Sequence, residues 1–228
     1  MTHDTRTTGR DQAAIRVWDL PTRLFHWGLV ALIVAMVATA WRGKLDLHMT
    51  LGQIVLALVL FRLVWGFVGN RYARFGSFVA GPVAALRYLA SLFSAQNERH
   101  VGHNPLGGYA VLAMLALLLL QAGTGLFTSD DIVTDGPLYS KVSGSTSALL
   151  STIHRTSIWV LLSVIALHVC ASLFYLLVKK DNLIGPMLTG RKQAGPADDA
   201  GGGGHPLLAA IIFALCLAIV FGGIAMVK

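Results

Sequence analysis

Residues 154–168 read HRTSIWVLLSVIALH, an apolar run with a histidine at each end and an arginine beside the first. With its flanks this run is long enough to cross a bilayer, since a helical span needs about 20 mostly apolar residues. The step of fourteen residues from one histidine to the other advances a helix by about 21 Å and turns it by about 1,400°, some 40° short of four full turns. His154 and His168 therefore lie on nearly one face of the helix, at two depths in the membrane.

The composition of the whole chain is that of an integral membrane protein. Of its 228 residues, 55% are hydrophobic and only 13% are charged, about half the charged share of a soluble domain. The basic residues that give the net charge of +7 lie between apolar runs. We therefore expect them to set the membrane topology and to contact anionic lipid headgroups rather than nucleic acid. Cys170 and Cys216 form no CxxC or CxxCH motif, so neither thiol redox chemistry nor covalently attached haem is indicated.

Five apolar segments are predicted to span the membrane: residues 25–41, 48–68, 106–127, 153–178 and 206–227. The N-terminal tail and the connections 69–105 and 179–205 carry twelve Lys and Arg residues, whereas the two alternate connections carry three. Positive charge accumulates on the cytoplasmic side of membrane proteins. We therefore expect a cytoplasmic N-terminus in a bacterial inner membrane.

The predicted fold class is all-α: an integral membrane four-helix bundle that holds two haems, plus a fifth C-terminal transmembrane helix. Residues 1–15 are polar and read as a disordered cytoplasmic tail, and residues 16–190 form the four-helix core. Residues 191–205 read as a flexible, Gly-rich linker, and residues 206–228 as the fifth helix, an appendage to the core. Within the core, GPVAALRYLASLF predicts a short interfacial helix that begins at Pro82.

Four of the eight histidines, His26, His48, His154 and His168, lie in or at the mouth of a core span. Ionisable residues inside a bilayer are costly and usually face a partner in the bundle. Depth pairs His26 with His168 in the inner leaflet and His48 with His154 in the outer leaflet. Two facing imidazoles in each layer are the ligand set of a bis-histidine haem. The second ring nitrogen is expected to bond a carbonyl one turn back.

We therefore predict two haem b groups, with no open axial position and no catalytic residue. Arg23, Arg62 and Arg155 each lie near one of these histidines in sequence or depth, and could pair with the haem propionates. Other readings stay open at this stage. The ring of His26 in FHW could belong to an aromatic belt, Arg62 could snorkel to the interface, and Arg23 could be a topology charge.

Four segments resemble the prokaryotic cytochrome b561 family, which includes the b-type cytochrome subunits of nickel–iron hydrogenases. They are RVWDLPTRLFHW, VGHNPLGGYAVL, TGLFTSDDIVTDGPLY and IHRTSIWVLLSVIALHVCASLFYLLVKKDNLIGPMLTG, which lie between residues 16 and 190. The resemblance implies a two-haem membrane bundle that transfers electrons between the quinone pool and a redox partner. It also implies that the four core histidines match the family's ligand positions. The fifth span departs from four-span members and leaves the assembly open, a homodimer included.

Partner sites are weaker predictions. Asp130, Asp131 and Asp135 in an outer connection could dock a periplasmic c-type cytochrome or oxidoreductase, or simply form a solvated loop. His103 and Asn104 could bond a quinone oxygen, although Asn-Pro could equally cap the following helix.

Three functions remain in view. The first is a respiratory electron-transport subunit that links the quinone pool to a periplasmic cytochrome c, dehydrogenase or hydrogenase. The second is a stand-alone superoxide:quinone oxidoreductase, in which the outer cations Arg42, Lys44 and Lys141 attract the anion. The third is a non-redox anchor or metal transporter, for which midplane carboxylates or broken spans would be expected.

Overall fold

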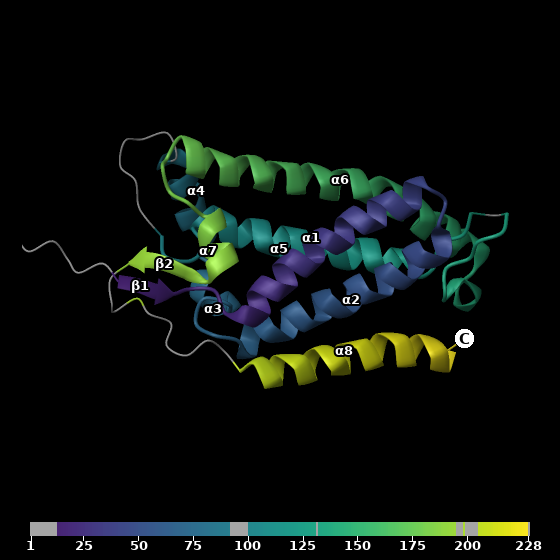
Figure 1. Cartoon of the computed structure of the whole chain (residues 1–228). Helices are drawn as coiled ribbons and strands as arrows, with labels where there is room; N and C mark the ends of the chain where they lie inside the picture. Colours follow the sequence, from purple (N-terminus) through teal and green to yellow (C-terminus); the bar gives the residue numbers. More distant parts are fainter. Residues whose placement is uncertain (1–12, 92–99, 131, 195–197, 199–204, 228) are drawn as a thin grey trace, which may run out of the picture.

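Five long helices run side by side in the computed structural model of the chain, which describes residues 13–91, 100–130, 132–194, 198 and 205–227 (Figure 1). They are α1 (Leu20–Trp41), α2 (Leu45–Val68), α5 (Pro105–Gly125), α6 (Gly144–Leu177) and α8 (Pro206–Val227). Each is long and apolar enough to cross a membrane. The predicted all-α membrane fold with five spans is confirmed.

Two helices begin earlier than hydropathy alone predicts, because polar residues cap them. The Asp19 side chain accepts a hydrogen bond from the Thr22 amide, so α1 begins at Leu20 rather than residue 25. Ser143 caps α6 in the same way through the Thr146 amide. The first turns of α1 and α6 are therefore helical although their residues are too polar to be predicted as part of a span. At 34 residues, α6 is about 51 Å long, more than the bilayer's hydrocarbon thickness of about 30 Å.

The central helix of the bundle is α2, which packs against α1, α5 and α8. Its buried residues include Val55, Leu58, Phe61 and Trp65, and they form the core of the largest hydrophobic cluster. In contrast, α6 packs closely on α5 and makes few close backbone approaches to α1 or α2. The side of α6 that faces α1 and α2 is therefore the looser part of the bundle.

The C-terminal helix α8 lies along α2 (Figure 1). Its residues Ala209, Cys216, Val220 and Ile224 belong to the main hydrophobic cluster. Small residues such as Ala and Cys let two membrane helices approach closely. The fifth helix, expected as an appendage, thus shares the hydrophobic core of the bundle.

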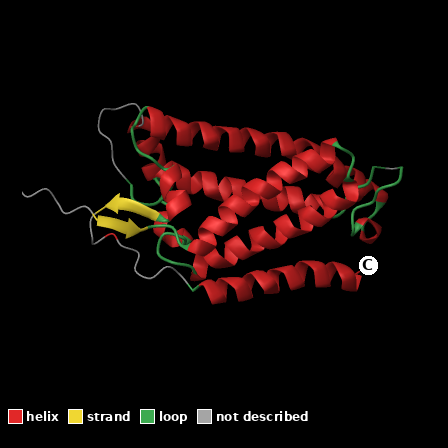
Figure 2. Cartoon of the chain, viewed as in Figure 1, coloured by secondary structure: helices red, strands yellow, loops and turns green. Residues whose placement is uncertain are grey.

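One end of the bundle carries short elements, and we call it the inner end after the predicted topology. Strand β1 (Ala13–Arg16) pairs antiparallel with β2 (Arg191–Ala194), as Figure 2 shows. These strands take the last residues of the expected tail and the first of the expected linker; residues 1–12, 195–197 and 199–204 lie outside the described part. Gly190 precedes β2 with φ of 83°, and a Cβ there would lie 2.8 Å from the Trp18 carbonyl oxygen. Only glycine fits this turn without strain.

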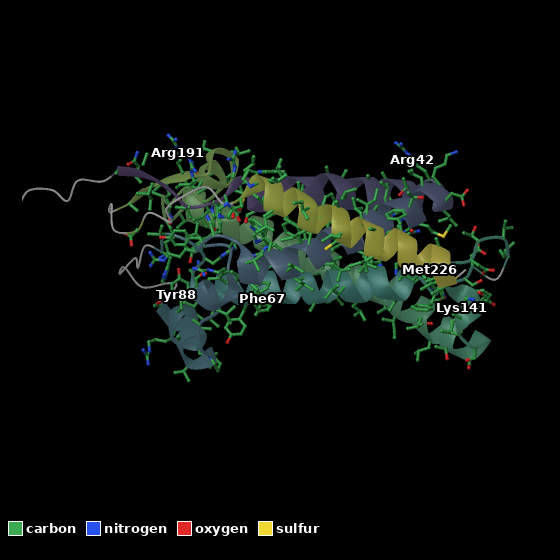
Figure 3. The ribbon with its side chains drawn as sticks, turned by 90° about the horizontal axis from the view of Figure 1, so that it is seen from below. Arg42, Phe67, Tyr88, Lys141, Arg191 and Met226 are labelled. Atoms are coloured by element: carbon green, nitrogen blue, oxygen red, sulfur yellow. The ribbon has the colours of Figure 1, made fainter. Side chains whose placement is uncertain are left out.

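The remaining elements are α3 (Phe75–Phe78) and α4 (Pro82–Ser91) between α2 and α5, α7 (Ile184–Thr189) before β2, and the 3₁₀ turn Tyr139–Lys141 at the opposite, outer end. The helix predicted to begin at Pro82 is confirmed as α4. Figure 3 shows Arg191 at the inner end, and Arg42 and Lys141 at the outer end.

Candidate haem-binding site

Two histidine pairs face each other in the bundle, one near each end. At the inner end, His26 on α1 faces His168 on α6, with ring centroids 6.5 Å apart and planes at 58°. At the outer end, His48 on α2 faces His154 on α6, with centroids 6.4 Å apart and planes at 88°. These are the two pairs that depth in the membrane predicts.

The spacing within each pair suits two ligands of one metal ion. A metal–imidazole bond is about 2.0 Å long, and a ring nitrogen lies about 1.1 Å from the ring centre, so two rings on opposite sides of one ion have centroids about 6.2 Å apart. The separations of 6.5 and 6.4 Å lie close to this value. Within the described ranges, no group of three or more His, Cys, Asp or Glu residues could hold a metal. The donor set is therefore two isolated imidazole pairs, which fits two bis-histidine haems.

In both outer histidines, Nδ1 is engaged by a backbone carbonyl. His48 Nδ1 donates to the Met36 carbonyl oxygen of α1 at 3.0 Å, and His154 Nδ1 donates to the Gln121 carbonyl oxygen of α5 at 2.9 Å. A hydrogen bond at Nδ1 fixes the tautomer and leaves Nε2 as the basic nitrogen for a metal. The expectation of a carbonyl one turn back on the same helix is wrong here. Both acceptors lie on the neighbouring helix, α1 for His48 and α5 for His154.

The inner end instead gathers buried polar atoms that lack partners. Within the described part they belong to Thr22 (Oγ1), Arg23 (Nε), His26 (Nδ1), Arg62 (Nη1) and His103 (Nδ1). Unsatisfied buried donors are rare and call for an explanation. Two of them are guanidinium nitrogens, so an anionic group at this end would satisfy them. The propionates of a haem bound between the inner pair fit that requirement.

The three candidate arginines differ in placement. Arg62 on α2 is 3% exposed; its Nη2 donates to the Ala73 carbonyl at 3.1 Å, and its guanidinium lies 5.0 Å from the centre of the Phe75 ring. A buried arginine of this kind does not snorkel. Arg23 donates to the carbonyl of Leu188, a residue of α7. Arg155 is exposed on α6, next to His154 of the outer pair. Their propionate roles remain predictions.

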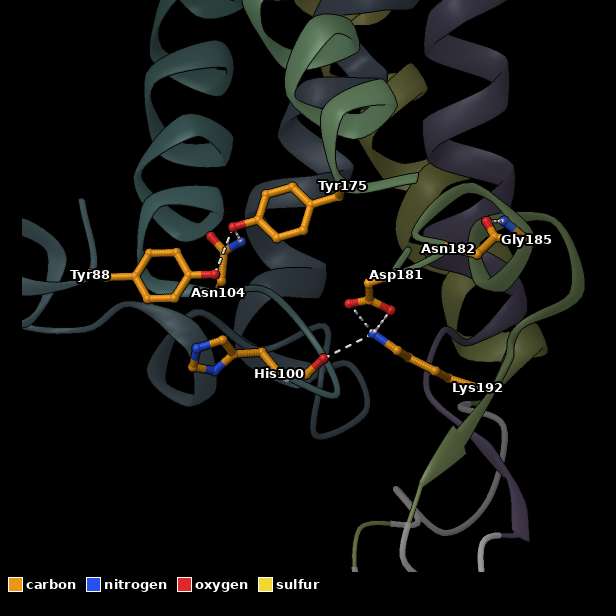
Figure 4. Close-up of polar contacts among 8 residues, drawn as sticks. All are labelled: Tyr88, His100, Asn104, Tyr175, Asp181, Asn182, Gly185 and Lys192. Atoms are coloured by element: carbon orange, nitrogen blue, oxygen red, sulfur yellow. Dashed lines mark hydrogen bonds and ion pairs between the residues drawn. The ribbon is translucent and has the colours of Figure 1, made fainter. Parts of the chain in front are cut away.

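Asn104 lies where α5 begins, near Tyr88 and Tyr175 from other elements (Figure 4), whereas the ring of the preceding His103 contacts Trp18 and Phe78. Asn104 Oδ1 accepts from the Gly107 amide at 2.7 Å, which confirms that it caps α5. Its Nδ2 donates to Tyr175 Oη at 3.2 Å, and Tyr175 shares a 2.7 Å hydrogen bond with Tyr88 of α4. Burial, reinforced by Arg62 and by the inner histidine pair, lowers the pKa of His103 to about 3. Its ring is therefore neutral at physiological pH.

In the outer acidic loop, Asp130 has a local structural role. Its Oδ1 accepts backbone N–H groups of Ile132, Val133 and Thr134 at 3.0, 2.9 and 2.8 Å. These bonds lower its pKa to about 2. Asp131 lies outside the described residues. The carboxylate of Asp130 folds the turn, which agrees with a solvated loop and leaves docking a prediction.

Four residues that touch or orient the site were missed in the sequence: Asp19, Thr39, Gln121 and Thr124. Asp19 links the start of α1 to α2 near the inner pair. The others lie within hydrogen-bonding reach of the outer histidines. Of these, Gln121 could have been predicted from the sequence, because an isolated amide in an apolar span usually faces a partner inside the bundle.

Comparison with known proteins identifies the family. A family model described as prokaryotic cytochrome b561 matches residues 17–190, which include all four paired histidines. The chain belongs to the prokaryotic cytochrome b561 family. It is thus a multi-pass membrane b-type cytochrome, and the resemblance in its histidine segments is confirmed.

Relatives of this cytochrome carry one recurrent description, "Probable Ni/Fe-hydrogenase B-type cytochrome subunit". The Rhizobium leguminosarum bv. viciae protein is 23% identical over 80% of this chain and 90% of its own length. The Rhodobacter capsulatus protein is 24% identical over 80% and 83%, respectively. The Escherichia coli K12 hydrogenase 1 subunit is 23% identical over 78% and 90%. No solved structure matches this cytochrome significantly.

Proposed function

We propose that this cytochrome holds two haem b groups, one in each leaflet, and carries electrons across the membrane between the quinone pool and a redox partner on the outer face. The observation that carries the proposal is the pair of matched imidazole separations, 6.5 Å and 6.4 Å. Each suits one iron, and both pairs share helix α6.

The residues have distinct tasks in this proposal. His26 and His168 would ligate the inner iron, and His48 and His154 the outer iron. These histidines would hold the two haem groups, which when bound would supply reversible one-electron transfer rather than substrate binding at iron. Because His154 and His168 stand about 21 Å apart along α6, the two layers divide the membrane between them.

The arginines would meet the propionates. Arg62 supports this role best, since its unpartnered Nη1 is buried and a buried cation needs an anion or full hydrogen bonding. Arg23 offers an unpartnered Nε at the same end. Arg155 would act at the outer surface, where its exposure leaves it free to reach a propionate at the membrane edge.

A quinone would exchange electrons near the inner pair. The neutral imidazole of His103 has a buried Nδ1 without a partner among the described residues, so it can donate to or accept from a quinone oxygen. Asn104 is less suited, because both ends of its amide already have partners.

The partner would be an oxidoreductase on the periplasmic side of a bacterial inner membrane, with the N-terminus of this chain in the cytoplasm. The relatives described as hydrogenase cytochrome subunits support a hydrogenase as one such partner. A c-type cytochrome is the other.

Four single substitutions test the ligand assignment. His26→Ala, His168→Ala, His48→Ala and His154→Ala should each reduce the haem content of the purified protein from two per chain towards one. His205→Ala, an exposed histidine in the linker, is the matched control and should retain two. Haem content that survives all four substitutions would refute the assignment. Rapid haem reduction by superoxide alone, with no partner protein, would favour the stand-alone oxidoreductase.

A further inference from the structure

The outer end of α5 is shaped around the ring of His154. A Cβ built on Gly125 would lie 2.9 Å from His154 Cε1 and 3.2 Å from its Nδ1. Real Cβ contacts are longer than 3.0 Å, so the ring could not keep its position against alanine. Two residues earlier on the same helix, a Cβ on Gly123 would meet nothing within 4 Å. The close approach is thus specific to position 125.

Two polar groups hold the same nitrogen. His154 Nδ1 donates to the Gln121 carbonyl oxygen at 2.9 Å, and Thr124 Oγ1 lies 3.4 Å from that nitrogen. The Thr124 hydroxyl proton goes to the Leu120 carbonyl at 2.7 Å. A lone pair of Thr124 therefore faces the ring, and the Nδ1–H has two acceptors on α5.

The Gln121 side chain adds a third contact. Its Nε2 lies 3.2 Å and 3.3 Å from the two ring nitrogens of His154, nearly equidistant, so it lies against the ring rather than at one nitrogen. The same amide donates to the His154 carbonyl at 3.1 Å, and its oxygen accepts from Ser157 at 2.6 Å. Gln121 thereby binds both the ring and the backbone turn that carries it.

Helix α1 repeats part of this arrangement for His48. Its Nδ1 has the Met36 carbonyl at 3.0 Å and Thr39 Oγ1 at 3.4 Å, with the threonine three residues after the carbonyl, as on α5. Thr39 also donates back to the Ala35 carbonyl, at 2.8 Å. At the inner end, His26 Nδ1 has no partner among the described residues. Among the described residues, both members of the outer pair thus have a carbonyl and a threonine hydroxyl at Nδ1.

We propose that Gln121, Thr124 and Gly125 form a seat that sets the plane of the His154 imidazole nearly perpendicular to that of His48. The proposal rests on haem binding at the outer pair, as proposed above. The three are positioning residues, which act through a ligand instead of touching iron. Perpendicular axial imidazoles make the low-spin ferric EPR signal strongly anisotropic, whereas less perpendicular planes, such as 58°, make it more rhombic. The seat thus has a spectroscopic signature.

The test compares Gly125→Ala, Thr124→Val and the matched control Gly123→Ala, each purified with its haem. Alanine is favoured over glycine within helices, so Gly123→Ala should keep two haems per chain and the wild-type EPR spectrum. Gly125→Ala should lose the most anisotropic signal, with haem content between one and two per chain. Thr124→Val should keep both haems and shift that signal alone.

The outcomes separate this proposal from the one on which it rests. Wild-type protein without haem would refute the two-haem function. Wild-type protein with two haems, but with unchanged EPR spectra in both Gly125→Ala and Thr124→Val, would refute the seat and leave the function standing. Equal losses in Gly125→Ala and Gly123→Ala would also refute it, because the effect would then be general to the helix.

Discussion

Substitution of Asp19 by alanine should destabilise the inner end of the bundle. This carboxylate is fully buried. Its Oδ1 accepts from the Thr22 amide at 2.8 Å, and its Oδ2 accepts from Trp65 Nε1 at 3.1 Å and from the Asn70 amide at 3.5 Å. It therefore caps α1 and ties it to Trp65 of α2, which lies about one helical turn after Arg62.

The size of the effect follows from these bonds. Loss of a helix cap costs about 1 kcal/mol. Trp65 is 1% exposed, so its indole N–H would be left unpaired, which costs about 1–3 kcal/mol. We expect Asp19→Ala to lower the free energy of unfolding by about 2–4 kcal/mol. Asp19→Asn keeps a good cap but presents an amide to other donors, and should cost about 1–2 kcal/mol.

The assay is denaturation in detergent, followed in parallel by circular dichroism and by haem absorbance. Asp46→Ala is the control: Asp46 is exposed in the first turn of α2, and its loss should cost less than about 1 kcal/mol. Haem absorbance should change first in Asp19→Ala, because α1 carries His26. An Asp19→Ala protein as stable as the wild type, within about 0.5 kcal/mol, would refute the reasoning.

Three further predictions address other contacts. A Cβ on Gly66 would lie 2.0 Å from the Phe75 ring, so Gly66→Ala should lower the free energy of unfolding by about 1–3 kcal/mol in the same assay. The control Gly28→Ala, whose Cβ would meet nothing within 4 Å, should leave it unchanged. Equal stability of the two variants would contradict this prediction. Arg62→Gln removes a buried cation and should lower the midpoint potential of the inner haem on the order of 50 mV, about tenfold in the equilibrium constant; a redox titration in which only the outer haem shifts would count against it. Asp130→Ala should speed hydrogen exchange at the three amides that this carboxylate binds. In the wild type those amides should stay protected above pH 3.8 and lose protection as the pH falls through about 2, because the bonds favour the ionised form of Asp130. Protection that is unchanged in the variant would contradict this structural role.

The spans and the histidine pairs could be predicted from the sequence because both depend on one-dimensional quantities. Apolar length locates a span, and residue number along a span gives depth. Depth alone was enough to pair His26 with His168 and His48 with His154, since a ring cannot reach across the hydrocarbon.

Contacts between helices could not be predicted in this way. The acceptors of the outer histidines lie on α1 and α5. Which carbonyls they are depends on how the helices are rotated and how far apart they lie, and a uniformly apolar span has no periodicity from which this could be predicted. The pairing of β1 with β2 joins segments separated by nearly the whole chain, so no local pattern announces it. In the sequence, Asp19 resembles an ordinary charge near a span. Its hydrogen bond from Trp65, which ties α1 to α2, becomes evident only in the structure.

Whether the two histidine pairs hold two haems can be measured as the stoichiometry of haem in the wild-type protein, purified from membranes with ample haem supply. We expect two non-covalent haem b per chain, both low-spin and six-coordinate in the oxidised and reduced states. One haem or none per chain, or a high-spin centre that binds carbon monoxide readily, would contradict it.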